Sequence, residues 1–190
     1  MAWGKFSSQM SCITAAVLVS SGLTAAQRVS DLDGRAVNPF AQSSGKVVVL
    51  VFVRRDCPVS GRYAPTIQQI SKRYADKASF WLVYPDRSET AQSIRKSVAE
   101  YGYQLPVLRD PQRELVKLAR VQITPEVAVF DRNRHLVYDG RIDDWYMDLS
   151  RARPAATTHE LEDAIQAAMS GGAVARNEVR GVGCYISDLD

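Results

Sequence analysis

The sequence contains little cysteine, little histidine and no strong excess of one charge. Of its 190 residues three are cysteine and two are histidine, and the formal net charge is +3. A charge this small, carried by scattered basic residues, gives no reason to expect a nucleic-acid partner. Two histidines and no Cys-x-x-x-Cys spacing leave few ligands for a metal. We therefore predict neither a metal site nor a cofactor.

The sequence also lacks an apolar run of about 20 residues, the length that a membrane-spanning helix needs. The nearest approach is in residues 1–26, where Lys5 is the only charge, residues 13–19 are apolar and residues 24–26 are small. This pattern predicts a secretory signal peptide, cleaved before Gln27, and an exported protein in the periplasm or outside the cell. We expect no stable membrane span after cleavage; retention of the segment as an anchor is the alternative.

Export changes the number of available cysteines. Cys12 would leave with the signal peptide, so that only Cys57 and Cys184 remain, and in an oxidising compartment they can form one disulfide. Cys184 lies in a predicted C-terminal tail, residues 171–190, whose extended length up to Cys184 is about 40 Å. A domain of this size has a radius of gyration of about 15 Å, so that reach does not exclude a bond to Cys57. A static disulfide partner or an unpaired thiol is the alternative for Cys184.

Cys57 stands between a predicted strand and a predicted helix. The run from Val47 to Val53 is apolar and mostly β-branched, which is typical of a buried strand, and helical spacing of apolar residues begins at Pro58. A cysteine at such a turn faces backbone N–H groups and the positive end of a helix dipole, which both favour a thiolate. Ser60 stands where a second cysteine, three residues on, would complete a redox pair.

The remaining pattern predicts one domain, residues 27–170, with a mixed sheet flanked by helices. Helices alternate with strands in its first part and imply parallel pairing, whereas two apolar runs around a polar turn predict a closing hairpin. Pro65 should kink the helix after Cys57. Thr157 and Glu160 predict a capping box for the last helix. The expected elements are strands at 47–53, 80–84, 105–108, 121–130 and 135–142, and helices from 58, 89, 111 and 157.

Three features of the sequence resemble the thioredoxin-fold redoxin family, which includes peroxiredoxins and exported thiol-disulfide oxidoreductases. Cys57-Pro-Val-Ser follows a strand and precedes Pro65, as in the active-site helix of that fold. Thr124-Pro125 precedes a strand, as in its cis-proline segment. The closing hairpin and helix are the third feature. The resemblance implies a thioredoxin-like α/β fold with a redoxin-type strand–helix insertion at residues 86–110.

The resemblance also implies a site and a reaction. Cys57 would be the attacking thiolate of thiol-disulfide exchange, and Thr124 and Pro125, with Pro58 and Ser60, would bind the substrate. The expected partners are protein thiols or disulfides, or a redox partner protein. Because Ser60 cannot resolve a mixed disulfide, Cys184 is the candidate for that step.

The sequence is also compatible with two other activities. A thiol peroxidase would use arginines such as Arg54, Arg109 and Arg141 to polarise a peroxide, although Arg54 stands where peroxiredoxins place Thr or Ser. A copper-handling or binding module without turnover would use Cys57, Cys184 and His135.

One more segment invites a functional interpretation. Asp143, Asp144 and Trp145 lie in a long loop after the predicted hairpin, and loops of this length are often functional. Paired carboxylates beside an aromatic ring can line a partner groove. The plainer alternative is a turn around a buried Trp145.

Overall fold

The apolar run that begins at Val47 forms β1 (Val47–Phe52), every residue of which is buried. β1 is a central strand of a six-stranded sheet in the order β3-β2-β1-β5-β6-β9. It pairs in parallel with β2 (Ala78–Tyr84) and antiparallel with β5 (Glu126–Phe130), so that the sheet is mixed. The computed structural model describes residues 1, 29–172, 174 and 178–186, so that residues 2–26 of the predicted signal peptide lie outside the described part.

The order of the other elements along the chain follows the predicted alternation and closing hairpin. The remaining strands are β3 (Val107–Arg109), β4 (Ile123–Thr124), β6 (Leu136–Gly140), β7 (Tyr146–Asp148), β8 (Arg151–Ala152), β9 (Glu178–Val179) and β10 (Cys184–Tyr185). The helices are α1 (Pro39–Gln42), α2 (Pro58–Arg62), α3 (Ala64–Arg73), α4 (Ala91–Glu100), α5 (Glu114–Ala119) and α6 (Glu160–Ser170). The predicted insertion at residues 86–110 contains α4 and β3, and β3 forms one edge of the sheet.

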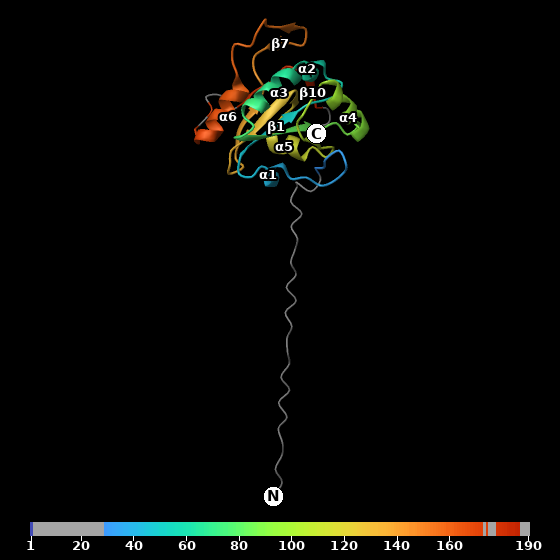
Figure 1. The fold of residues 1–190 in the computed structure, drawn as a ribbon, viewed down its shortest axis with the longest axis vertical. Coiled ribbons are helices and arrows are strands. Elements are labelled where there is room, and N and C mark those ends of the chain that lie inside the picture. Colours follow the sequence, from blue (N-terminus) through green and yellow to red (C-terminus); the bar gives the residue numbers. More distant parts are fainter. Residues whose placement is uncertain (2–28, 173, 175–177, 187–190) are drawn as a thin grey trace.

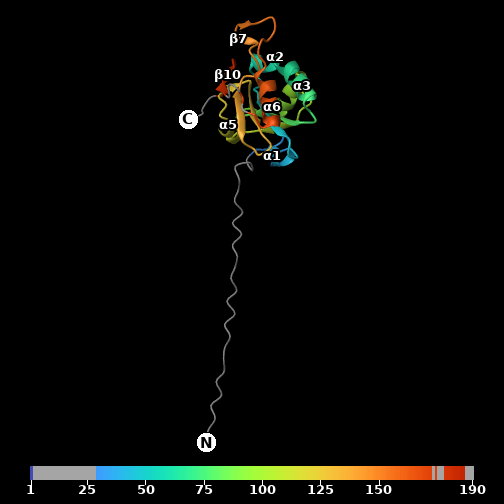
Figure 2. The same ribbon diagram turned by 90° about the vertical axis from the view of Figure 1, so that its left-hand side faces the viewer.

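Helices cover both faces of the sheet. Side chains of β1 alternate between two apolar clusters, one containing residues of α3, α4 and α6 and the other containing residues of α5. Figure 2 shows α3 and α6 on one side of the sheet and α5 on the other. The β7–β8 hairpin projects from the end of the molecule at which α2 lies (Figure 1). No helix among the described residues is long and apolar enough to span a membrane.

The helix that follows Cys57 is interrupted, as the proline pattern predicts. It divides into α2 and α3 at Tyr63, and Pro65 occupies the first turn of α3, where its missing N–H leaves no helical hydrogen bond unmade. The division leaves α2 as a separate short helix that begins directly after Cys57.

The capping box predicted for the last helix is wrong. His159 is the N-cap of α6 and makes no side-chain capping bond. The backbone N–H and hydroxyl of Thr157 instead donate to the Asp144 carboxylate, and Glu160 pairs with Arg141. A remote carboxylate therefore takes the donors that the local pattern assigned to a helix cap.

The described part of the C-terminal tail returns across the domain. β9 runs parallel to β6, and β10 pairs antiparallel with β4, which places Cys184 opposite Thr124. Ile186 then enters the apolar cluster on the α5 face and is 4% exposed. The tail is thus packed on the domain at both ends of the segment 178–186.

Candidate functional site

Cys57 is held at the end of β1 by the turn that starts α2. It is the N-cap of α2, and its own N–H donates to the Arg54 carbonyl at 3.4 Å. The residue is fully buried. In its thiol form Cys57 donates to the carbonyl oxygen of Thr124, with Sγ and oxygen 3.0 Å apart. The Cys57 side chain therefore faces the Thr124–Pro125 segment, as the resemblance implied.

The groups around Cys57 favour its thiolate. Burial raises the pKa of Cys57, but polar groups of Cys184 and Ser60 beside its sulfur lower it, and the net pKa lies below its usual value. The Thr124 carbonyl, which accepts only from the thiol form, acts in the opposite direction. Ser60, in the position of the missing second cysteine, thus favours the thiolate.

Cys184 lies beside Cys57 with its thiol reduced. Both cysteines are free, and Cys57 is buried whereas Cys184 is only partly buried. Burial and the neighbouring Cys57, through its polar contact and its charge, raise the pKa of Cys184. Of the two thiols, Cys57 therefore ionises first as the pH rises.

A close backbone approach brings Cys184 to this position. A Cβ on Gly183 would lie 2.0 Å from the Thr124 carbonyl oxygen, and a Cβ on Gly181 would lie 3.0 Å from that of Pro125. The Thr124 hydroxyl also donates to the Cys184 carbonyl at 3.3 Å. Glycine at 183 is therefore required for the tail to pair with β4.

The buried carboxylate of Glu126 fastens the tail to the same segment. One of its oxygens accepts from the Gly181 N–H at 2.8 Å, and the other accepts from the N–H groups of Gln122 and Ile123 at 3.0 and 3.2 Å. Arg180 lies 3.7 Å from this carboxylate. Glu126 thus ties the tail to the turn that precedes Thr124.

The predicted site residues come together, with the tail covering part of them. The Thr124–Pro125 peptide is cis, as expected from the resemblance, and both residues are buried. Ser60 is 2% exposed, whereas Pro58, at the start of α2, is exposed. β10 occupies the backbone edge of β4 that an incoming chain would need.

A model of the AhpC/TSA family matches residues 24–139. The chain belongs to this family. Its fold is shared by an uncharacterized conserved protein from Geobacillus kaustophilus, at 23% identity and a TM-score of 0.67 over 84% of this chain and 86% of that one. A hypothetical protein from Sinorhizobium meliloti 1021 has 24% identity and a TM-score of 0.66 over 83% of this chain and 88% of that one. A secreted Mycobacterium tuberculosis disulfide oxidoreductase has 17% identity and a TM-score of 0.54 over 75% of this chain and 97% of that one. No curated protein matches the sequence.

The thioredoxin-like redoxin fold predicted from the sequence is confirmed by these comparisons and by the mixed sheet. The arginines that a peroxidase of this family would need are engaged with other groups. Arg54 donates to the Tyr185 carbonyl and pairs with Asp56 and Asp86. Arg109 donates to the Glu89 carbonyl, and Arg141 donates to Glu160 and Thr158.

The two histidines lie in other surroundings than the cysteines. His135 lies 3.3 Å from the Asp131 carboxylate in the turn between β5 and β6, and His159 precedes α6. Among the described residues, no three His, Cys, Asp or Glu side chains are grouped so that they could hold a metal. In the part of the chain that the structure describes, Cys57, Cys184 and His135 therefore do not form a copper site.

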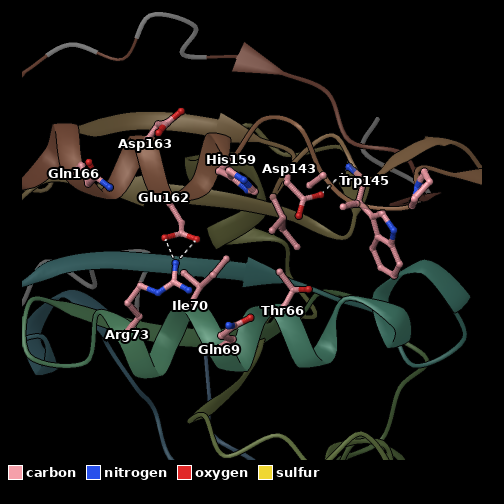
Figure 3. Close-up of a pocket in the computed structure, with 14 residues that line it drawn as sticks. Thr66, Gln69, Ile70, Arg73, Asp143, Trp145, His159, Glu162, Asp163 and Gln166 are labelled. Carbon is pink, nitrogen blue, oxygen red and sulfur yellow. Dashed lines mark hydrogen bonds and ion pairs between the residues drawn. The ribbon is translucent and has the colours of Figure 1, made fainter.

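A hollow of about 600 Å³ lies between α3 and α6, and Cys57 and Cys184 are absent from its lining. Figure 3 shows Arg73 of α3 and Glu162 of α6 facing each other, with 2.6 Å between guanidinium nitrogen and carboxylate oxygen. Asp143 and Trp145 line one end (Figure 3).

The carboxylates of the 143–145 loop serve internal bonds. Asp143 accepts from the Tyr63 hydroxyl at 2.6 Å and from the Trp145 N–H at 2.9 Å. Asp144 accepts from Thr157 and Thr158 and pairs with Arg153 at 3.2 Å. These contacts favour the plainer interpretation of the loop, although Trp145 is only partly buried.

The sequence pattern did not lead to a prediction for Glu126, and for Gly183 it predicted only a backbone free to turn tightly. The signal for Glu126 was a single acid within an otherwise apolar strand, which demands a buried partner. The signal for Gly183 was a glycine directly before a cysteine, which allows a close backbone approach.

Proposed function

We propose that this redoxin is a thiol-disulfide oxidoreductase whose redox pair is Cys57 and Cys184. The observation that carries the proposal is that the pairing of β10 with β4 places Cys184 opposite Thr124, whose carbonyl oxygen lies 3.0 Å from the Cys57 sulfur. The pair replaces one in which the second cysteine would stand at Ser60. Oxidation joins the two sulfurs in a disulfide and releases two electrons and two protons to the oxidised substrate.

The reduced pair reacts with a disulfide through the stabilised sulfur. When the tail leaves β4, the Cys57 thiolate attacks a substrate disulfide, one substrate sulfur leaves as a thiolate, and Cys184 displaces the other from the mixed disulfide. Thr124 and Pro125, with Pro58 at the rim, would bind the substrate chain in place of β10. Ser60 supports this step because it lowers the pKa of Cys57. The partners would be protein thiols or disulfides, or a redox protein that resets the pair.

Thiol counting and alkylation rates test this function. In a Cys12→Ser background, two thiols should titrate after reduction and none after oxidation, whereas Cys57→Ser and Cys184→Ser should each retain one. In the Cys184→Ser variant, the alkylation of Cys57 by iodoacetamide should reach half its maximal rate at a lower pH than that of a free cysteine, whose pKa is about 8.5. A midpoint no lower than that of a model thiol would contradict the proposal.

A thiol peroxidase is the second candidate, because the chain belongs to the AhpC/TSA family. In that reaction Cys57 would take an oxygen from a peroxide, and Cys184 would condense with the resulting sulfenic acid. Consumption of hydrogen peroxide, measured with and without Cys57, separates the two activities. A copper titration tests the remaining alternative of a copper-handling module.

Export to the periplasm or the outside belongs to the same proposal. It rests on the pattern of residues 1–26, and one solved structure with this fold is that of a secreted protein. The mass of the protein recovered from the cell envelope or the medium should show a mature chain that begins at Gln27.

A further inference from the structure

The two sulfurs of the proposed pair differ in access. Cys57 is fully buried beneath β10, between Ser60, Thr124 and Cys184. Cys184 lies on β10, which pairs only with β4 among the described residues, and its neighbour Tyr185 is 72% exposed. A disulfide between the two would keep β10 in place, so that a thiol from solution meets Cys184 first.

The two sulfurs also differ as leaving groups. When the bond between them breaks, Ser60 remains beside Cys57, buried with it, and lowers the pKa of its thiol. Cys184 is disfavoured as a thiolate by burial and by its neighbour. A thiol with a lower pKa leaves faster in exchange reactions. The greater access of Cys184 and the better leaving group at Cys57 therefore both favour attack on the sulfur of Cys184.

We propose that, in the oxidised protein, an external thiolate attacks Sγ of Cys184, so that the mixed disulfide with the substrate forms on the C-terminal tail and not on Cys57. This inference rests on the proposed Cys57–Cys184 pair. In the reaction of the reduced pair described above, β10 must leave β4 before Cys57 can attack a substrate disulfide. In the oxidised protein the first step needs no such movement of β10.

The reaction balances with a dithiol as the reductant. The first substrate thiolate forms a bond to Cys184 Sγ, the Cys57–Cys184 bond breaks, and Cys57 leaves as a thiolate. The second substrate thiolate attacks the first substrate sulfur and releases Cys184, which takes up a proton. The substrate loses two electrons and becomes a disulfide, and the protein gains them as one thiolate and one thiol. The substrate class is a solvent-exposed dithiol that can reach the surface around Tyr185.

Glutathione has no second thiol of its own for the next step, so that the first adduct persists long enough to be trapped. The oxidised Cys12→Ser protein is mixed with glutathione, quenched with acid after short intervals, alkylated and digested with trypsin. Cys57 lies in the peptide 56–62 and Cys184 in the peptide 181–190, so that mass spectrometry distinguishes them. We expect glutathione on 181–190 and alkylation on 56–62 at the earliest times.

Two other outcomes are possible, and one contradicts the inference alone whereas the other contradicts the proposed function as well. Glutathione first on peptide 56–62 overturns the inference but leaves the proposed pair intact. Failure of the two peptides to form a disulfide in the oxidised protein overturns the proposed function, and the inference with it.

A leaving-group variant supplies a second readout. Ser60→Ala removes the hydroxyl beside Cys57, which should raise the pKa of the Cys57 thiol and slow glutathione attack about threefold. Ser150→Ala, on the exposed β7–β8 turn, is the matched control and should leave the rate unchanged. An unchanged rate in Ser60→Ala would mean that Cys57 is not the leaving group, which overturns the inference.

Discussion

Two buried carboxylates, Glu126 and Asp144, each fasten a segment that comes later in the chain. Glu126 accepts from the N–H of Gly181 in the tail, and Asp144 accepts from the N–H groups of Thr157 and Thr158 before α6. Each also lies near an arginine, Arg180 for the tail and Arg153 for the loop, whose guanidinium nitrogens are 3.7 and 3.2 Å from the carboxylates.

The same physical device has different consequences in the two places. The segment that Asp144 holds leads into α6 and carries no reactive group, so that its attachment contributes to stability. The segment that Glu126 holds carries Cys184 to Cys57, and its attachment assembles the thiol pair. The difference lies in the side chain that the fastened segment brings, and variants of the two regions should therefore separate reactivity from stability.

The largest effect is expected from Gly183→Ala. The added Cβ would overlap the Thr124 carbonyl, so β10 must move away from β4 and Cys184 becomes a tethered thiol in place of a docked one. Disulfide formation between Cys57 and Cys184 in a glutathione buffer should slow by about 100-fold. Gly172→Ala, where the Cβ meets only the Ser170 side chain, is the control. A rate within twofold of the wild type would show that pairing with β4 does not position Cys184.

Asp144→Ala should act on stability alone. It leaves the donors of Thr157 and Thr158 without their acceptor and should lower the free energy of unfolding by about 3 kcal/mol. Urea denaturation measures this loss, with Asp148→Ala in the exposed hairpin as the control. The alkylation rate of Cys57 should stay unchanged. A large change in that rate would show that Asp144 also affects the thiol pair, and would contradict the separation of stability from reactivity.

Glu126→Gln should have a smaller effect on stability and a visible one on the thiol. The amide oxygen can still accept one N–H, but the charge that attracts Arg180 is lost, which should cost about 1–2 kcal/mol. Because the tail then leaves β4 more often, iodoacetamide should reach Cys57 several times faster than in the wild type. An unchanged alkylation rate would show that Glu126 fastens the turn before Thr124 but not the tail.

The smallest effect concerns pH. Burial raises the pKa of Asp144, but hydrogen bonds from Thr157 and Thr158 and the nearby Arg153 lower it further, so that the net pKa lies below its usual range. A depressed folded-state pKa gives stability that is present above the unfolded value of about 3.9 and is lost as the pH falls below it. The stability difference between wild type and Asp144→Asn should thus shrink from pH 7 to pH 3, and a constant difference would contradict this.

Local patterns in the sequence predicted most of the architecture. The β-branched run before Cys57, the helical spacing after it and the two apolar runs around residues 131–134 produced β1, α2 with α3, and the β5–β6 hairpin. Periodicity reports which faces of an element are buried, and the buried faces of successive elements define the sheet and its layers. The cap of α6 failed because Asp144, remote in sequence, competes for Thr157.

The sequence by itself determined that Cys57 begins a helix after a buried strand, that Ser60 replaces its usual partner, and that a second cysteine lies within reach on the tail. Only the tertiary structure decided that Cys184 stands opposite Thr124, whose carbonyl contacts the Cys57 sulfur. Chain length bounds what a tail can reach, whereas its position depends on contacts with no sequence periodicity: one buried carboxylate at Glu126, and a backbone approach that Gly183 permits.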